Sequence, residues 1–571
     1  MMILRRAVPA LVAVALLGGA CGADPVRTPP PSAPATPVPS ATPTPTEVPF
    51  APAAFPAAGS ACGRDGYEGR MGRIEALDEQ TVRFTLCAPD GAFPVRLAHP
   101  ALSILDAAAV AHLATDATTR RALAGTGPYA IDRWVPGENV ALRRIAAGAT
   151  EVAVTPVVIL SWAADPATRT SALKDASVDG IDAPGAAELE DIATLPELVP
   201  TPRPGLATAF LAFGSGPAFA GARVRRAIAG SLDRETLTAS AFPAGTLVPT
   251  HLTPCIVEGA CRGRPWYGFN APAASAVLAE ASFDLKRSYP LHVPDAAIPG
   301  LPDPAGVAEA VQAQLKGNIG LRTRIDAMPY DEFRRAASRG TLAGLYIDGI
   351  ASTVADASGF LDPLFGEGVR TTPARRASGV SRALGQAAAS ADPAVREAAV
   401  GRANTAIRAT AVLVPLAHPG SVVAYRSDVA GVMTSPLGLD PLGAAIPGDR
   451  PQLVFTQASE PDGAWCGDQP SFDAYRLCGL VFDGLYGFDP GKVVPNLRLA
   501  GSSKANDTAT KWTIRLRSGL EFSDGTTVDA GDVLATFVAQ WDATSPLRRG
   551  APEGAFAAWG ELFGPPLEGG G

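Results

Sequence analysis

Cysteines are the residues of this chain with the clearest chemical potential. Seven occur in the sequence, and those after residue 60 are Cys62, Cys87, Cys255, Cys261, Cys466 and Cys478. Their even number favours disulfides in an oxidising compartment, with Cys255 to Cys261 and Cys466 to Cys478 as local pairs and Cys62 to Cys87 as the third. Metal coordination is the alternative, although the CxxC spacing of zinc sites is absent and the five histidines are scattered.

Catalytic motifs are absent from the rest of the sequence. We find no GxSxG elbow, no GxxxxGK[ST] loop and no HExxH pair. The glycine-rich run at 125–129 contains Pro128, which removes a backbone N–H that a phosphate cradle would use. Acidic pairs such as Glu188 and Asp191 fit an ordinary charged helical face. The sequence therefore predicts neither an enzyme nor a metal or cofactor site.

Length, composition and charge limit the class of protein. With 571 residues, 47% of them apolar, the chain can bury more than one core, which indicates several lobes. A formal net charge of −8 gives no basic surface for a phosphate backbone, so we expect no nucleic-acid partner.

The first 21 residues are typical of an export signal. Arg5 and Arg6 precede a short apolar run at 7–17, which is too short to span a bilayer. Residues 16–21 resemble a bacterial lipobox in which Cys21 would be lipidated, with a departure from the usual pattern at Gly18. We expect an extracytoplasmic, membrane-anchored lipoprotein, in the periplasm or on the cell surface, with a plain secreted protein as the alternative.

Residues 22–57 are rich in Pro, Thr, Ala and Ser and predict a disordered tether. In a polyproline-like conformation such a segment reaches on the order of 100 Å. No later segment has the unbroken apolar length of a transmembrane helix.

The remaining sequence alternates strand and helix patterns, which indicates an α/β protein. Residues 81–86 and 512–517 alternate strictly between apolar and polar, as half-buried strands do. Asp529 precedes an apolar stripe typical of a capped helix. A second helical stripe ends at Leu315, and we expect that helix to stop at Gly317.

Three segments resemble motifs of one known family. Residues 516–533 read LRSGLEFSDGTTVDAGDV and resemble the LRdGvkFsDGtpvtAeDV signature of family 5 extracellular solute-binding proteins of ABC importers, the oligopeptide, dipeptide and nickel-binding type. Residues 125–143 begin with GTGPY and continue through PGE to Leu-Arg, as in that family. Residues 223–235 are similar to its vRqAiayaiDre motif.

These motifs occur in a different order from that of the family. Residues 485–497 and the FSDG run come last here, although the corresponding family segments come early. Joined tail to head, the pieces make about one binding protein, so the sequence resembles a circularly permuted member.

The resemblance implies a type II periplasmic-binding-protein-like fold, a Venus flytrap with two main lobes and a small extra lobe. We expect a C-terminal-type portion at 58–446, a splice at 447–450 and an N-terminal-type portion at 451–571. The expected lobes are the small lobe (58–126 and 486–571), lobe I (127–215, 425–446 and 451–485) and lobe II (216–424).

The same resemblance implies a ligand site between the lobes. The expected ligand-binding residues are Glu460 in the first strand-loop, Phe213 at the hinge, Tyr346, Thr353 and Asp356 in lobe II, and His418. In peptide binders of the family an Asp at the position of Thr353 pairs with the peptide ammonium. Thr353 cannot supply that charge, so we expect the ligand to be a blocked peptide, a sugar or another small molecule. A peptide held by its free N-terminus would mean that another acid, such as Asp356, has taken over the role.

The function implied is delivery of a peptide or another small solute to the permease subunits of an ABC importer, by a monomeric protein without catalytic activity. The alternative is a surface-tethered sensor or scaffold with no role in transport.

Overall fold

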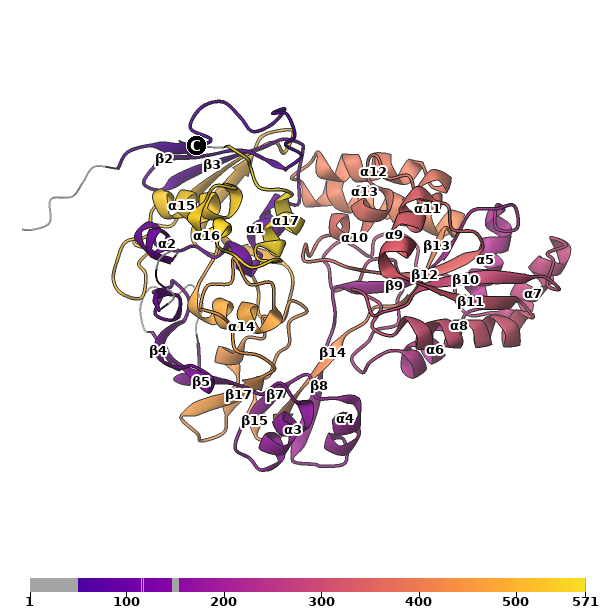
Figure 1. Ribbon diagram of the computed structural model, residues 1–571, viewed down its shortest axis with the longest axis horizontal. Coiled ribbons are helices and arrows are strands. Elements are labelled where there is room, and N and C mark those ends of the chain that lie inside the picture. The colour runs from indigo at the N-terminus through magenta and orange to yellow at the C-terminus, as the bar shows by residue number, and fades with distance from the viewer. Residues whose placement is uncertain (1–49, 114–115, 117, 146–152, 570–571) are drawn as a thin grey trace, which may run out of the picture. The chain divides into compact units, whose positions relative to one another are not determined.

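A computed structural model describes residues 50–113, 116, 118–145 and 153–569 (Figure 1). Within it, Phe50–Gly571 forms one compact unit. The expected export segment, Cys21 and the tether up to residue 49 lie outside the described residues. The prediction of a disordered tether up to residue 57 is wrong at its end, since Ala53–Phe55 form strand β1. The reason is Phe55, a buried side chain whose ring packs 5.1 Å from that of Trp541.

The small lobe is built on an antiparallel five-stranded sheet. In spatial order its strands are β1 (Ala53–Phe55), β2 (Met71–Asp78), β3 (Thr81–Leu86), β21 (Lys511–Leu516) and β20 (Ala500–Ala505). The two strands predicted from alternation are confirmed as β3 and β21, and they pair directly, with Trp512 opposite Phe84. The lobe also contains α1 (Phe93–Leu97), α2 (Ala107–Leu113), α15 (Ala530–Trp541), α16 (Pro546–Arg549) and α17 (Ala557–Phe563).

Helix α15 begins where its sequence predicts. The side chains of Asp529 and Asp532 form a capping box that satisfies the first backbone N–H groups. Phe537, on the buried face of the helix, packs with its ring 5.2 Å from that of Phe84. The helix therefore covers the sheet with the apolar stripe seen in its sequence.

Lobe I is built on a seven-stranded sheet. Its spatial order is β4 (Tyr129–Val135), β5 (Asn139–Arg144), β6 (Val157–Trp162), β17 (Gln452–Gln457), β7 (Gly180–Asp182), β14 (Ser421–Arg426) and β8 (Leu198–Arg203). The helices of this lobe are α3 (Pro166–Lys174), α4 (Ala186–Ile192) and α14 (Phe472–Val481). Strand β17 lies between β6 and β7 and is parallel to both, so residues after 450 occupy the centre of this sheet.

Lobe II is built on the sheet β11 (Arg322–Met328), β10 (Ser288–Pro294), β12 (Leu345–Ala351), β9 (Ala207–Phe213) and β13 (Leu413–Ala417). The first three strands are parallel, and β9 is antiparallel to both of its neighbours. Figure 1 shows α12 (Gly379–Ala388) and α13 (Pro393–Thr410) on one side of these strands, and α6 (Arg234–Ala241) and α8 (Pro304–Ile319) on the other. The remaining helices are α5 (Ala222–Gly230), α7 (Ala271–Glu280), α9 (Tyr330–Arg339), α10 (Ala357–Phe365) and α11 (Thr372–Arg376).

Helix α8 runs past Gly317, where we expected it to stop. It ends at Ile319, followed by Gly320 in the left-handed conformation at φ 69°. Glycine adopts this conformation without strain, so the second glycine provides the C-cap.

The chain passes between lobes I and II at two short crossings. Strand β8 ends at Arg203 and β9 begins at Ala207, while β13 ends at Ala417 and β14 begins at Ser421. The expected boundaries at 215 and 424 are therefore wrong, because β9 belongs to the sheet of lobe II and β14 to that of lobe I. The two crossings lie in contact, since a Cβ on Gly205 would overlap the carbonyl oxygen of Pro419.

The buried side chains follow the same division. One cluster joins the small lobe to lobe I, for example through Phe84, Trp541, Leu453 and Phe455. A second cluster fills lobe II and includes Phe210. The described chain thus has two main hydrophobic cores, and the two crossings lie between them.

Candidate functional site

The segment that follows β12 lies where ligands commonly bind in open α/β sheets, beyond the carboxyl ends of parallel strands. Strand β12 ends at Ala351, and the N–H of Ser352 then donates to the carbonyl of Leu206 at the first crossing. The hydroxyl of Ser352 donates to the carbonyl of Val354 and shapes the turn. Helix α10 then begins with Asp356 as its N-cap.

A cavity of about 740 Å³ lies between this segment and the small lobe; we call it the interlobe cavity. The small lobe contributes Arg70, Arg96 and Glu561, while lobe II contributes residues on both sides of Thr353. Its lining from lobe II includes Ser352, Thr353, Ser358, Asp362, Glu367 and Ser381. The wall therefore carries hydroxyl, carboxylate and guanidinium groups from two parts of the molecule with separate cores.

A second cavity, of about 600 Å³, adjoins the first and lies within lobe II. Both cavities are lined by Ala351 and Pro363. The second also contains Tyr346 and Asp348. Strand β12 and the segment after it therefore contribute to the walls of both cavities.

Asp348 is the buried acid of this second cavity. Its Oδ2 accepts a hydrogen bond from Arg334 Nη1 at 3.2 Å, and its Oδ1 accepts from the N–H of Gly349 at 2.8 Å. Burial raises the pKa of its carboxyl to about 6, against the opposing effect of the Arg334 charge. Arg334 and Gly349 thus already hold this carboxylate.

Two of the sequence-predicted ligand residues line these two cavities. Tyr346 lines the second cavity, and burial raises the pKa of its phenol. Thr353 lines the interlobe cavity, where its hydroxyl donates to Glu561 Oε2 at 2.8 Å. This bond joins lobe II to the small lobe.

Asp356 is engaged in structural contacts. Its Oδ1 accepts from the N–H of Ser358 at 2.9 Å, and its Oδ2 pairs with Arg396 Nη2. Burial acts to raise the pKa of this carboxyl, but Arg396 and the Ser358 hydrogen bonds hold it below its ordinary value. The two oxygens of this carboxylate therefore already have partners: one caps α10 and the other pairs with Arg396 of α13.

The other three predicted ligand residues lie elsewhere. Phe213 is fully buried in lobe II, with its ring 5.7 Å from that of Phe219. His418 lies buried at the second crossing, with Nδ1 3.0 Å from the hydroxyl of Thr208, and burial lowers its pKa to about 4. Glu460 accepts hydrogen bonds from the indole of Trp134 and the N–H of Gly137 in lobe I, both at 2.8 Å.

Sequence reasoning missed most of the charged groups of the interlobe cavity. Thr353 and Glu561 are 208 residues apart, and no local pattern relates them. Arg70 and Arg96 are single basic residues in an unremarkable context.

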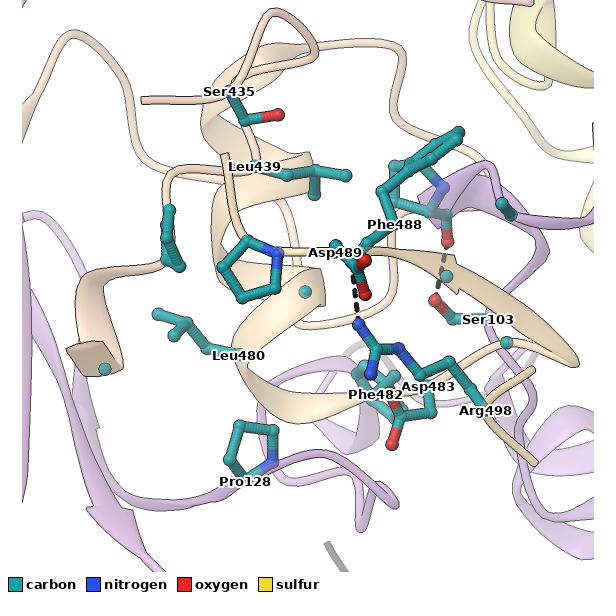
Figure 2. A pocket seen from close by; sticks show the side chains of 18 of the residues that line it. Ser103, Pro128, Ser435, Leu439, Leu480, Phe482, Asp483, Phe488, Asp489 and Arg498 are labelled. Carbon is teal, nitrogen blue, oxygen red and sulfur yellow. Dashed lines mark hydrogen bonds between the residues drawn. The ribbon is translucent and has the colours of Figure 1, made fainter. Parts of the chain in front are cut away.

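A smaller cavity of about 130 Å³ lies where lobe I meets the small lobe, beside α14. Its wall is mixed, with Leu480, Phe482 and Phe488 beside the polar side chains of Ser435 and Asp489 (Figure 2). The guanidinium of Arg498 lies at its edge and donates to the carbonyl of Phe488 at 2.7 Å. Its volume is far below that of the other two cavities.

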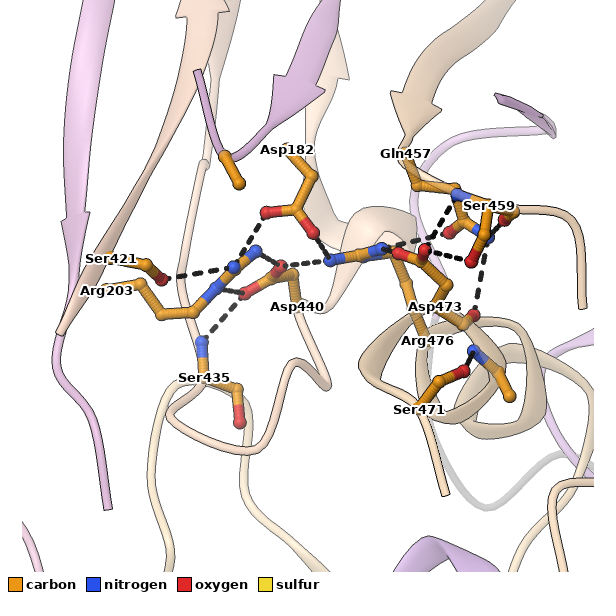
Figure 3. Close-up of polar contacts among 12 residues, drawn as sticks. Asp182, Arg203, Ser421, Ser435, Asp440, Gln457, Ser459, Ser471, Asp473 and Arg476 are labelled. Carbon is orange, nitrogen blue, oxygen red and sulfur yellow. Dashed lines mark hydrogen bonds and ion pairs between the residues drawn. The ribbon is translucent and has the colours of Figure 1, made fainter. Parts of the chain in front are cut away.

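Lobe I contains a buried network of arginines and aspartates, shown in Figure 3. Arg476, with no exposed side-chain surface, lies 2.6 Å from Asp182 and 3.0 Å from Asp473. Arg203 lies 2.7 Å from Asp182 and also pairs with Asp440. Burial acts to raise the pKa of Asp182, but the two guanidinium groups hold it well below its usual range.

This network also positions the loop that begins at Ser459. The carboxylate of Asp473 accepts from the N–H of Ser459 at 2.8 Å and from its hydroxyl at 2.6 Å. The neighbouring Glu460 is therefore held by a fixed loop.

All three expected disulfides are present: Cys62 to Cys87, Cys255 to Cys261, and Cys466 to Cys478, with Cα–Cα distances of 5.2, 5.3 and 5.8 Å. His251 lies beside the second pair, with its ring nitrogen and both sulfurs within 4.8 Å of one another. Because the two sulfurs are bonded to each other, they are not available as thiolate metal ligands.

Comparison with known sequences gives one consistent result. The family model described as bacterial extracellular solute-binding proteins, family 5 Middle, matches residues 37–371. Heme-binding protein A of Haemophilus influenzae is 25% identical over 378 residues, which cover 64% of this chain and 68% of the relative. Di/tripeptide-binding protein 2 of Pseudomonas aeruginosa is 27% identical over 403 residues, which cover 68% of this chain and 73% of the relative.

Solved structures show a similar fold. HbpA2 from Haemophilus parasuis superposes with a TM-score of 0.51 at 24% identity, over 56% of this chain and 64% of that chain. The murein tripeptide-binding protein MppA, in an unliganded open form, gives 0.51 at 14% identity, over 68% of this chain and 90% of that one. Among the described residues, no helix combines the length and apolar character needed to cross a membrane.

Proposed function

Because the chain belongs to the bacterial extracellular solute-binding proteins of family 5, we propose that it captures a peptide or another small solute outside the cytoplasm and delivers it to an ABC importer. Its fold is the expected type II periplasmic-binding-protein-like architecture of mixed α/β lobes. The carrier performs no chemistry on its ligand in this proposal.

The observation that carries the proposal is the interlobe cavity. Its polar lining comes from two bodies with separate cores, connected by the crossings near Gly205 and Pro419. A solute that contacts both bodies would favour their approach, and a permease could recognise the closed form. The expected hinge therefore belongs at residues 204–206 and 418–420, and not at Phe213.

The first experiment is to identify the ligand. Native mass spectrometry of protein purified without refolding would detect a co-purified small molecule, and calorimetric titration with di- to pentapeptides would measure its replacement. We expect Ser381→Phe, which places an aromatic ring in the wall of the interlobe cavity, to weaken binding strongly, and Ser502→Phe on an exposed part of β20 to leave it unchanged. Equal binding by both variants would refute the cavity as the site.

Membrane attachment through a lipid on Cys21 is a separate proposal, which rests on the lipobox-like segment. Metabolic labelling with a palmitate analogue tests it: wild-type protein should carry the label and Cys21→Ala should not. Export without any label would instead favour the secreted form.

We also propose that the chain is one monomeric fold with a circularly permuted order. In support, residues 447–450 form a short joint: Gly448 adopts φ 58°, and Arg450 pairs with Asp179 at 2.8 Å and with Asp428 at 2.7 Å. Fragment 50–450 should aggregate alone and regain a cooperative melt when it is mixed with 451–571. If fragment 50–450 is monomeric, melts cooperatively alone and does not change when 451–571 is added, the single-fold proposal is contradicted.

A further inference from the structure

The disulfide between Cys255 and Cys261 differs from the other two in its surroundings. It lies on the loop of lobe II between α6 and α7, where Cys255 is exposed and Cys261 is half-buried. The buried ring of His251 lies beside it, with one ring nitrogen and both sulfurs within 4.8 Å of one another. Among the residues that the structure describes, neither of the other two disulfides belongs to such a group of metal-ligating side chains.

Hydrogen bonds from outside the disulfide hold the backbone on both sides of His251. The carbonyl of Thr250 accepts from the N–H of Trp266 at 2.7 Å, and the carbonyl of Leu252 accepts from the hydroxyl of Thr208 at 2.8 Å. The ring itself is less engaged, because Nδ1 contacts only the neighbouring Thr250 hydroxyl at 3.1 Å and the loop sulfur at 3.9 Å, while Nε2 is buried without a hydrogen-bond partner among the described residues. A buried polar atom without a partner is uncommon, and a neutral imidazole is the commonest metal ligand in proteins.

The backbone around Cys261 is also fixed by contacts other than the disulfide. Asn404, buried on α13, donates from Nδ2 to the carbonyl of Ala260 at 2.8 Å and to that of Arg262 at 2.9 Å. These two carbonyls flank the cysteine. Opening the disulfide should therefore leave Cys261 close to its present place, while the exposed side chain of Cys255 can rotate.

The two thiols that reduction would release suit a thiophilic metal ion. A zinc–thiolate bond is about 2.3 Å long, so two sulfurs on one tetrahedral ion lie roughly 3.8 Å apart, a separation that side-chain rotation can supply. Two thiolates and an imidazole provide three of the four ligands of such an ion and leave one position open, as in some zinc sites. Sulfur ligands favour zinc and monovalent copper over magnesium and calcium.

We propose that reduction of the Cys255–Cys261 disulfide turns this loop into a binding site for a thiophilic metal ion such as Zn²⁺, held by the two thiolates and the imidazole of His251. A dithiol supplies the two electrons and two protons of the reduction and becomes a disulfide itself. The metal ion then displaces the two thiol protons, and reoxidation of the cysteines by a disulfide oxidant releases it. None of the three ligands lines the interlobe cavity, so the site is separate from solute capture.

The test uses the full-length chain with Cys21→Ala, which removes the one cysteine outside the three pairs. The folded protein is reduced with a dithiol, freed of reductant and titrated with Co²⁺ without oxygen, and Zn²⁺ is then added as a competitor. Sulfur-to-cobalt charge-transfer absorption reports thiolate ligands, and ligand-field absorption reports a tetrahedral site. We expect the reduced protein to bind one Co²⁺ ion with both absorptions, Zn²⁺ to displace it, and the oxidised protein to show neither absorption.

Variants identify the ligands. His251→Ala should weaken Co²⁺ binding to the reduced protein by about 100-fold or more and leave both thiols present in a thiol titration. Cys255→Ser should abolish the tetrahedral site. The matched control joins Cys62→Ser to Cys87→Ser, which removes the other partly exposed disulfide, and it should bind Co²⁺ as the parent protein does.

Each other outcome overturns the proposal. It fails if peptide mapping shows that Cys255 and Cys261 stay bonded when the folded protein is treated with the dithiol. It also fails if the reduced protein shows no sulfur-to-cobalt absorption, if the oxidised protein binds Co²⁺ equally well, or if Cys255→Ser leaves the absorption unchanged. The comparison of reduced with oxidised protein keeps all three ligands, so it decides the matter even if a variant does not fold.

Discussion

Two regions of the molecule use arginine and aspartate in opposite ways. In lobe I, Arg476 and Arg203 alternate with aspartates so that each carboxylate has a guanidinium partner (Figure 3). In the interlobe cavity, Asp362 lies near two arginines but bonds to neither. The comparison teaches how much a guanidinium partner matters to a buried carboxylate: paired arginines keep Asp182 ionised, whereas burial disfavours the ionised form of Asp362.

The largest expected effect is a loss in the free energy of unfolding when the buried network of lobe I is broken. Arg476→Met would leave Asp182 and Asp473 buried with fewer cationic partners, and breaking a buried ion pair in this way costs about 3–5 kcal/mol. Urea unfolding should show the loss. Arg223→Ala, in an exposed pair with Glu280, should change stability little. If Arg476→Met loses little unfolding free energy, water must reach the network, and the contrast between the network and Asp362 would not hold.

The sequence alone predicted the elements but not these charges. Alternation over residues 81–86 and the Asp529 cap led to β3 and α15, because those signals are local. The boundary at 215 failed because β9 has no sequence feature that assigns it to one sheet or the other. The partners of Arg476 lie as far as 294 residues away, and Glu561 and Thr353 are 208 apart, so only the folded chain relates them.

The second-largest expected effect is the stability that acid removes by protonating Asp182 of the network. Acid should affect the two regions differently. The pKa of Asp182 in the folded protein lies well below its unfolded value near 3.9, so its stabilisation is complete above about pH 5 and is lost as pH falls toward the folded value. We expect a loss of about 2 kcal/mol from this group between pH 5 and pH 2. Urea unfolding of wild type and Asp182→Asn across this range measures it, and equal pH slopes for the two proteins would contradict it.

The smallest expected effect has the opposite sign and concerns Asp362. Its folded-state pKa of about 6 lies above the unfolded value near 3.9, so the penalty for ionising it in the folded protein is nearly complete above pH 6, declines as pH falls from about 6 to about 4, and is absent at lower pH. Asp362→Asn should therefore stabilise the ligand-free protein at pH 7.5 by about 1 kcal/mol, a figure reduced for its partial exposure to water.

Thermal melts of wild type, Asp362→Asn and Glu367→Gln at pH 7.5 and pH 5 measure this effect. The difference between Asp362→Asn and wild type should be present at pH 7.5 and fall by roughly half at pH 5, where Asp362 is protonated in the folded protein but still ionised in the unfolded chain. Glu367 is exposed at the same rim, so Glu367→Gln should show no such difference at either pH. A destabilised Asp362→Asn at pH 7.5 would mean that the carboxylate already has a stabilising partner in the ligand-free protein. In that case Asp362 would resemble Asp182, and the contrast between the two regions would fail.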